Sequence, residues 1–238
     1  MTDLSTVRLV ATDLDGTLLR SDGTVSQRTR TALSAATDAG IVIAFATGRP
    51  PRWLHEVAEA TGHNGMAVSA NGAVLYDMAT EKVVAEHILS TELLTEVTAA
   101  LRAQFPRIVF GIEYGENTER SEPPFLTFGA EPGYRHDWQI SPPADRHGLA
   151  AAPPFVADLA TIISQPGVKL LVKDGSVESG RFHEHVTALL GDRVSVTYSS
   201  TEGLLEIGAV GVTKATGLAY LAEQHGIGCE RRSGDARQ

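Results

Sequence analysis

Two aspartates near the N-terminus, Asp13 and Asp15, have the type and spacing that most clearly point to chemistry. They follow the apolar run Val7–Thr12, and Gly16 behind them allows a sharp turn. Residues two apart in an extended chain point to the same side, so the carboxylates would share one acidic site. Like charges a few ångströms apart repel by about 1 kcal/mol even at the dielectric of water. A Mg²⁺ ion with oxygen ligands would remove that repulsion, and a carboxylate beside it can act as nucleophile, acid or base.

The same two aspartates would be ordinary in a turn, where they cap backbone N–H groups, so the pair needs support from elsewhere. A second apolar run, Ile41–Ala46, ends in Thr47-Gly48-Arg49, and a pair of prolines then opens a stretch predicted to be helical. A hydroxyl beside the free N–H groups of a helix N-terminus suits a phosphate. It equally suits an ordinary helix cap.

A third candidate group lies far along the chain, where Val212-Thr213-Lys214 opens an amphipathic helix. A lysine in the first turn is electrostatically unfavourable, because the helix dipole favours cations at the opposite end. Lys214 therefore indicates an anionic partner, with a solvated surface lysine as the alternative. Asn71-Gly72 is a two-residue hairpin signal, and Asn71 either faces the same site or only forms the turn.

Together these residues resemble the haloacid dehalogenase superfamily of phosphotransferases, and most closely its Cof-like sugar-phosphatase branch, which carries a C2-type α+β cap. Asp13 and Asp15 are similar to the first motif of that family, Thr47 to the second and Lys214 to the third. The stretch that begins at Asn71 resembles an Asn-Gly-Ala sequence common in that branch. The resemblance covers residues from about 7 to 227.

The resemblance implies a Mg²⁺-dependent hydrolase of phosphate monoesters. Asp13 would attack phosphorus and form an aspartyl-phosphate, and Asp15 would act first as acid and then as base. Thr47 and Lys214 would hold phosphate oxygens, while Asp13 and the backbone of Asp15 would bind the metal. The family pattern implies further substrate contacts from Gly16, Thr17, Gly48, Arg49 and Asn71.

The chain departs from the family pattern behind the predicted helix Thr213–His225. Similar proteins continue with an apolar strand and an acidic motif, whereas here the mainly polar run Cys229–Gly234 follows, and then Asp235. Asp235 is either a third metal ligand or a residue of a polar tail. The abrupt change in composition predicts a truncated chain or a reading-frame slip. The alternative function is then a catalytically impaired protein that binds ligands or partners without turnover.

This departure has a structural consequence. In the sheet of the family, the strand that precedes Asp13 lies in the middle, so a lack of later strands would expose its edge. Exposed edges pair with other chains. We therefore predict poor solubility, a homodimer through that edge, or a rearranged tail.

The composition of the 238 residues, with 42% hydrophobic and 21% charged, is ordinary for a globular protein. The formal net charge of −9 argues against a nucleic-acid partner but leaves a small phosphorylated metabolite open, because a local cation sets the potential of a site. No apolar run or N-terminal pattern indicates a membrane span or signal peptide. A single cysteine, Cys229, favours a reducing, cytoplasmic setting.

In the first part of the chain strands and helices alternate, which predicts an α/β, Rossmann-like core with a parallel sheet. Predicted strands cover 7–13, 41–47 and 66–70, and predicted helices cover 26–39 and 50–60. Ligands in such sheets bind at the carboxyl ends of the strands, where all the candidate residues lie. A phosphorylated receiver domain also uses an aspartate and a lysine, but it is much shorter and has no inserted cap.

From about Lys82 the pattern changes to that of an α+β domain. We expect strands at 83–89, 108–113, 168–173, 194–198 and 204–207, and helices at 91–104 and 179–190. Proline pairs make 114–166 irregular. We therefore assign 1–82 and 209–238 to the core, which we expect to be incomplete at its C-terminal end, and 83–208 to an inserted cap. Candidate cap contacts, each of which would alternatively just cover surface, are Glu113, Tyr114, Tyr134, Arg135, His136 and Trp138.

Overall fold

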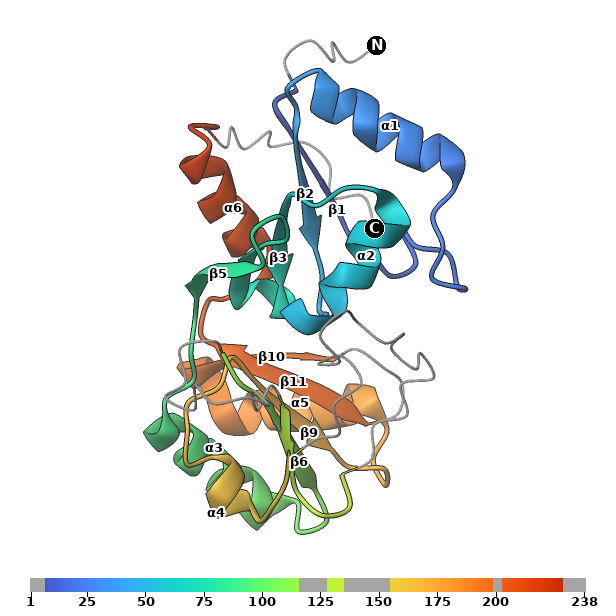
Figure 1. Ribbon diagram of the computed structural model, residues 1–238. Coiled ribbons are helices and arrows are strands. Elements are labelled where there is room, and N and C mark those ends of the chain that lie inside the picture. The colour runs from blue at the N-terminus through green and yellow to red at the C-terminus, as the bar shows by residue number, and fades with distance from the viewer. Residues whose placement is uncertain (1–6, 116–127, 135–154, 199–202, 229–238) are drawn as a thin grey trace.

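The computed structural model describes residues 7–115, 128–134, 155–198 and 203–228 (Figure 1). They form a first lobe and a second lobe, each built around its own β-sheet. The chain leaves the first lobe behind β5 (Lys82–Glu86) and returns to it with α6 (Lys214–Gln224). Residues from both ends of the described sequence therefore meet in the first lobe.

The sheet of the first lobe has the strand order β1-β2-β3-β4-β5. Strands β1 (Leu9–Thr12), β2 (Val42–Ala46) and β3 (Met66–Ser69) are parallel neighbours. Strands β4 (Val74–Asp77) and β5 are antiparallel to their neighbours. The predicted parallel α/β arrangement is confirmed, and it brings the ends of β1 and β2 to the same edge.

Helices cover both faces of this sheet because side chains alternate along each strand. Ile43 and Phe45 of β2 share a buried cluster with α1 (Gln27–Asp38) and α2 (Leu54–Thr61). The alternate residues Ala44 and Ala46 pack with Leu218 and Leu221 of α6 on the other face. The α6 helix is thus fixed against the sheet by apolar burial on its inner side.

A side-chain cap and a glycine mark the two ends of α1. The Ser26 side chain accepts a hydrogen bond from the N–H of Thr29 at the start of α1, and Gly40 behind the helix has a positive φ of 77°. A 3₁₀ turn, η2 (Pro51–Trp53), precedes α2, so the predicted helix begins with a tighter turn than an α-helix.

The predicted two-residue hairpin at Asn71-Gly72 is wrong in its length. Ser69 pairs with Val74, so four residues connect β3 to β4, and they include a 3₁₀ turn, η3 (Ala70–Gly72). The reason is that backbone N–H groups of this connection do not face the partner strand. Those of Ala70 and Asn71 donate to the carbonyls of Arg49 and Thr47, which ties η3 to the end of β2.

The sheet of the second lobe has the order β10-β11-β9-β6-β7-β8. Its neighbours are antiparallel, apart from the parallel pair β7 and β8. The strands are β6 (Val109–Glu113), β7 (Phe128–Ala130), β8 (Phe155–Val156), β9 (Lys169–Lys173), β10 (Val194–Tyr198) and β11 (Leu204–Ala209). The short elements β7, β8 and α4 (Leu159–Ile162) lie within the segment predicted to be irregular, which is a correction to that prediction.

Helices α3 (Thr91–Gln104) and α5 (Ser179–Leu190) pack on one face of the second sheet, against Phe110, Val172 and Ile207 among others. Charged residues occupy alternate positions of the same strands. Glu113, Lys169 and Glu206 are buried on the opposite face, toward the first lobe (Figure 1). The second sheet therefore presents buried charges to the lobe that carries Asp13.

Two features of the strands bear on the expected domains and edges. The proposed domain division at residue 83 would cut β5, which pairs with β4, and a division behind Glu86 keeps the first sheet whole. Within the described residues β1 pairs only with β2, and Val10 is 38% exposed. A homodimer through this edge stays a prediction. None of the helices that the structure describes has the length and apolarity to cross a membrane.

Candidate active site

Asp13 and Lys214 meet at the edge of the first sheet. Lys214 Nζ donates a hydrogen bond to Asp13 Oδ2 over 2.9 Å, and the other carboxylate oxygen, Oδ1, accepts from the Leu14 N–H at 2.7 Å. Lys214 occupies the first turn of α6 because Thr213 caps the helix through reciprocal contacts with Thr216. The unfavourable position of this lysine on its helix is therefore offset by a carboxylate in front of the helix end.

Two glycines let α6 approach close enough for this contact. Gly72 has a φ of 104°, and a Cβ there would overlap the carbonyl oxygen of Thr213. At Gly217, a Cβ would lie 2.5 Å from Cγ1 of Val68, which is itself buried. The η3 turn thus sets the position of the helix that carries Lys214. From sequence, Gly72 looked like a turn residue alone.

Asp15 forms an ion pair with Arg49. The guanidinium donates from Nε to Oδ2 at 3.0 Å and from Nη2 to Oδ1 at 2.6 Å. Arg49 is 8% exposed, whereas Asp15 is 51% exposed. Two parallel hydrogen bonds to one carboxylate fix its orientation as well as its charge. Arg49 thus pairs with Asp15, and its expected contact with the substrate stays a prediction.

Thr47 lies at the carboxyl end of β2 and is buried. Its hydroxyl oxygen accepts a hydrogen bond from the N–H of Arg49 at 3.1 Å, which leaves the hydroxyl proton to donate. The backbone of Thr47 is held on both sides, since its N–H donates to Val68 and its carbonyl accepts from Asn71. The hydroxyl is therefore rigidly placed beside Arg49.

The turn behind Asp15 has the predicted sharp bend, with a φ of 72° at Gly16. A cavity of about 440 Å³ lies beside it, and its lining includes Asp15, Gly16, Arg49 and Val57. Thr17 is exposed, and its N–H donates to the Leu14 carbonyl at 3.3 Å. The cavity gives a small molecule access to the exposed Asp15 carboxylate.

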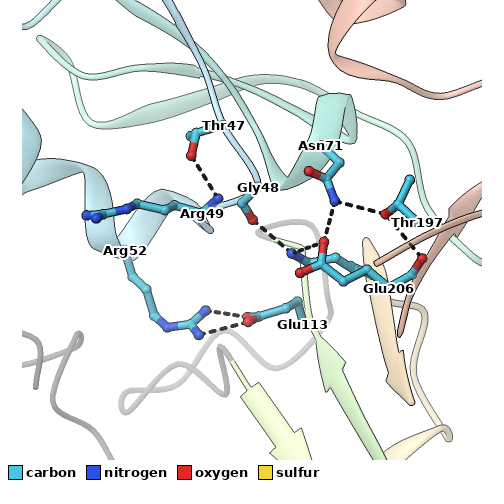
Figure 2. A network of polar contacts seen from close by, with 9 residues as sticks. Thr47, Gly48, Arg49, Arg52, Asn71, Glu113, Thr197 and Glu206 are labelled. Atoms are coloured by element: carbon cyan, nitrogen blue, oxygen red, sulfur yellow. Dashed lines mark hydrogen bonds and ion pairs between the residues drawn. The ribbon is translucent and has the colours of Figure 1, made fainter. Parts of the chain in front are cut away.

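Polar side chains of the second lobe reach the same region (Figure 2). Asn71 donates to Glu206 and to the hydroxyl of Thr197, the latter at 3.4 Å. Lys169 Nζ donates to the Gly48 carbonyl at 2.8 Å. Gly48 and Asn71, which the family pattern places at the substrate, thus contact the second lobe.

An ion pair also joins the lobes. The Arg52 guanidinium, in the η2 turn of the first lobe, donates to both carboxylate oxygens of Glu113, one bond measuring 2.9 Å (Figure 2). Arg52 and Glu113 are 11% and 6% exposed in their side chains. Removal of one partner of such a buried ion pair leaves an unmatched charge and strongly destabilises a protein.

The predicted cap contacts divide into three groups. Glu113 pairs with Arg52, and the Tyr114 hydroxyl donates to the Ile162 carbonyl at 2.7 Å. Burial, with the nearby charges of Glu113 and Glu206, raises the pKa of Tyr134 far above its usual value. Outside the described residues lie Arg135, His136, Trp138 and the proposed metal ligand Asp235.

Sequence reasoning missed three residues that join the lobes at this site, Arg52, Lys169 and Glu206. The available signal was a charge inside an apolar run, since Lys169 precedes Leu170-Leu171 and Glu206 lies between Leu205 and Ile207. A strand that buries one face against helices and keeps a charge on the other must satisfy that charge.

The donor set around Asp13 and Asp15 has the chemistry that Mg²⁺ prefers. Both residues offer partly exposed carboxylate oxygens, and each oxygen that accepts a hydrogen bond still has a second lone pair. Among the described residues, no group of three or more histidine, cysteine, aspartate or glutamate side chains could hold a metal.

Comparison with known proteins gives one family and several relatives. Residues 10–231 match the family model of the haloacid dehalogenase-like hydrolases. A 5-amino-6-(5-phospho-D-ribitylamino)uracil phosphatase of Bacillus subtilis is 34% identical over 71 residues, which are 30% of this chain and 28% of that protein. An HMP-PP phosphatase of Yersinia pestis is 28% identical over 151 residues, which are 59% of this chain and 52% of that protein. The chain thus spans about half the length, or less, of these relatives.

Similarity to solved structures extends further along the chain. A phosphatase of the HAD enzyme superfamily from Bacteroides thetaiotaomicron has a TM-score of 0.69 and 21% identity. The match covers 96% of this chain and 77% of that one. At 21% identity this similarity shows a shared fold, and it extends over both lobes.

Proposed function

The chain belongs to the haloacid dehalogenase-like hydrolases, and from that premise we propose that it hydrolyses phosphate monoesters of small metabolites. The proposal depends most on one observation, the hydrogen bond of 2.9 Å between Lys214 Nζ and Asp13 Oδ2. It joins a carboxylate able to attack phosphorus to a cation able to hold a phosphate oxygen.

In the first step, a carboxylate oxygen of Asp13 bonds to phosphorus while the bond from phosphorus to the leaving oxygen breaks. Asp15, in its protonated form, transfers a proton to that oxygen, so that a neutral alcohol leaves. Lys214 and the Thr47 hydroxyl stabilise the negative charge on the phosphoryl oxygens. The product of this step is an aspartyl-phosphate on Asp13.

In the second step, a water oxygen bonds to phosphorus and the bond between phosphorus and Asp13 breaks. Asp15 takes the proton from the water, which returns it to its starting form and releases inorganic phosphate. Arg49 keeps the Asp15 carboxylate in one orientation during both steps. Asp15 lies in a wall of the cavity described above.

Charge balance supports a divalent cation in this site. Lys214 matches the Asp13 carboxylate, and with Asp15 protonated for the first step the single charge of Arg49 does not match a bound phosphate dianion. We propose that the Asp13 carboxylate and the backbone carbonyl of Asp15 hold Mg²⁺. When bound, the ion neutralises charge on the phosphoryl oxygens. Asp235 is the proposed further ligand.

The names of the relatives support a substrate class. The two relatives named above are a 5-amino-6-(5-phospho-D-ribitylamino)uracil phosphatase and an HMP-PP phosphatase by name. We propose a small phosphorylated metabolite such as a sugar phosphate, whose non-phosphorylated part lies between the lobes. In that region, hydrogen bonds from Arg52 to Glu113 and from Asn71 to Glu206 join the lobes.

The test is hydrolysis of p-nitrophenyl phosphate with Mg²⁺, comparing the wild type with Asp13→Asn. We expect turnover that depends on the metal and falls to background in Asp13→Asn. Equal rates for the two proteins would refute the proposal. Absence of turnover in a folded wild type would instead favour a protein that binds ligands without hydrolysing them.

A further inference from the structure

Three successive carbonyls of the Thr47-Gly48-Arg49 loop each accept a hydrogen bond, but not from the same lobe. The Thr47 carbonyl accepts from the Asn71 N–H at 3.0 Å, and the Arg49 carbonyl from the Ala70 N–H at 2.9 Å. The Gly48 carbonyl between them accepts from Lys169 Nζ at 2.8 Å. The middle of a first-lobe loop is thus held by a side chain of the second lobe (Figure 2).

Lys169 itself has little freedom to move. It is 4% exposed and opens β9, where its backbone pairs with Glu113 on β6. Its ammonium lies 3.4 Å from Glu206 Oε2, and Glu206 is equally buried. A buried ammonium is tolerated only with such partners, so the contact with Gly48 belongs to a fixed arrangement.

Asn71 of the η3 turn also restricts the Thr47-Gly48-Arg49 loop. A Cβ at Gly48 would lie 2.9 Å from Asn71 Oδ1, and the same amide donates through Nδ2 to Glu206. Gly48 therefore lies between Asn71 and the Lys169–Glu206 pair. Displacement of Lys169 would leave the Gly48 carbonyl without the described donor and would free the loop on this side.

Arg49, which follows Gly48, connects the position of this loop to the candidate site. Arg49 holds Asp15 through two hydrogen bonds, and its backbone belongs to the loop that Lys169 fixes. We propose that Lys169 is a positioning residue, which sets the Arg49–Asp15 pair from the second lobe. The inference rests on the proposed function, because it concerns the residue proposed as acid and base. Lys169 does not itself touch the reacting atoms.

The positioning role and a purely structural role, in which Lys169 only stabilises the contact between the lobes, predict different kinetics. The positioning role predicts the following effects. Lys169→Met should lower kcat by about 10- to 100-fold with little change in KM, the size expected for a small misplacement of a catalytic group. The loss should be larger for an alkyl phosphate than for p-nitrophenyl phosphate, because p-nitrophenolate needs no proton to leave. A structural role predicts equal losses for both substrates.

A double-mutant cycle tests the route through Arg49. If Lys169 acts through Arg49, Lys169→Met should cause no further loss of kcat in an Arg49→Met background. If the two losses multiply, the proposed route is wrong. Lys82→Met removes an exposed lysine on β5 and is the matched control, expected to match the wild type.

A measurement without turnover separates this inference from the proposed function. Amide hydrogen exchange should be faster in Lys169→Met than in the wild type for peptides that span 45–49 and 69–73, and unchanged in Lys82→Met. Unchanged exchange in those peptides would overturn the inference even if the protein is an active phosphatase. If neither the wild type nor any variant turns over substrate, the proposed function is refuted. Amide hydrogen exchange then still tests whether Lys169 positions the loop. If Lys169→Met does not fold, Lys169→Met with Glu206→Gln leaves no buried charge unmatched and is measured in its place.

Discussion

Asp13 and Lys214 are 201 positions apart in the chain, and yet Lys214 Nζ lies 2.9 Å from Asp13 Oδ2. The chain between them forms the whole second lobe before it returns with α6. Close packing at Gly72 and Gly217 then seats that helix on η3 and β3. The contact thus depends on α6 packing against the first sheet.

Lys214→Met should reduce kcat/KM for a phosphate monoester by about 10²- to 10³-fold, the usual effect of removing one group that stabilises the transition state. The free energy of unfolding should change by less than about 1 kcal/mol, because the ion pair with Asp13 is partly exposed. Steady-state kinetics and urea unfolding measure the two effects. Full activity in this variant would show that Lys214 does not hold phosphate.

Gly72→Ala should destabilise the protein and lower its activity together. The left-handed backbone costs an alanine about 1 kcal/mol, and here the added Cβ also meets the Thr213 carbonyl. Gly40→Ala is the matched control, since Gly40 has a φ of 77° with open space around its Cβ position. Urea unfolding should show a larger loss for Gly72→Ala, and equal losses would contradict the role of Gly72 in seating α6.

Arg49→Met should affect poor leaving groups most. Without the two hydrogen bonds from Arg49, Asp15 loses its fixed orientation, so proton transfer to an alkoxide should slow more than loss of p-nitrophenolate. The measurement compares kcat for glycerol phosphate and for p-nitrophenyl phosphate. A uniform decrease would assign Arg49 to phosphate binding, as the family resemblance implied.

His63 should make the protein less stable in mild acid. Burial lowers the pKa of His63 below its ordinary 6.5, and a hydrogen bond to the Ile43 carbonyl opposes this only in part. Well above pH 6.5 the imidazole is neutral in both the folded and the unfolded state and contributes no difference in stability. As the pH falls below that value, His63 becomes protonated in the unfolded chain before it does so in the folded protein, because its folded pKa is lower. The free energy of unfolding therefore decreases.

His63→Gln is the variant that tests this assignment. Urea midpoints of the wild type should decrease more steeply between about pH 6.5 and 5 than those of His63→Gln. Parallel pH profiles would mean that another group causes the acid sensitivity. The variant keeps a side-chain donor for the Ile43 carbonyl, so its stability at pH 8 should stay near that of the wild type.

Periodic patterns predicted much of the fold. The helices at 91–104 and 179–190 and the strand at 194–198 have the expected bounds, because their apolar residues recur with one clear period. The strand segments β7 and β8 have three and two residues, too few for any period to appear. The connection at Asn71 was misjudged because Arg49 and Thr47, far away in sequence, take its N–H groups.

The residue types and positions in the sequence suggested candidate site residues but did not indicate which side chains contact one another. Asp13 and Lys214 were recognised by residue type and position on their elements, and the structure joins them. Whether Arg49 contacts phosphate or Asp15 depends on side-chain geometry, which cannot be predicted from spacing along the chain. The same holds for Lys169, whose partner Gly48 lies in another lobe.

The central claim is that Asp13 receives the phosphoryl group, and trapping of that intermediate tests it most directly. Asp15→Asn should form the aspartyl-phosphate but hydrolyse it slowly. After incubation with p-nitrophenyl phosphate and Mg²⁺ and an acid quench, peptide mass spectrometry should find one phosphoryl group on the peptide that contains Asp13. Asp13→Asn in the same background should carry none. Release of p-nitrophenol with the phosphoryl group on another peptide would contradict the account.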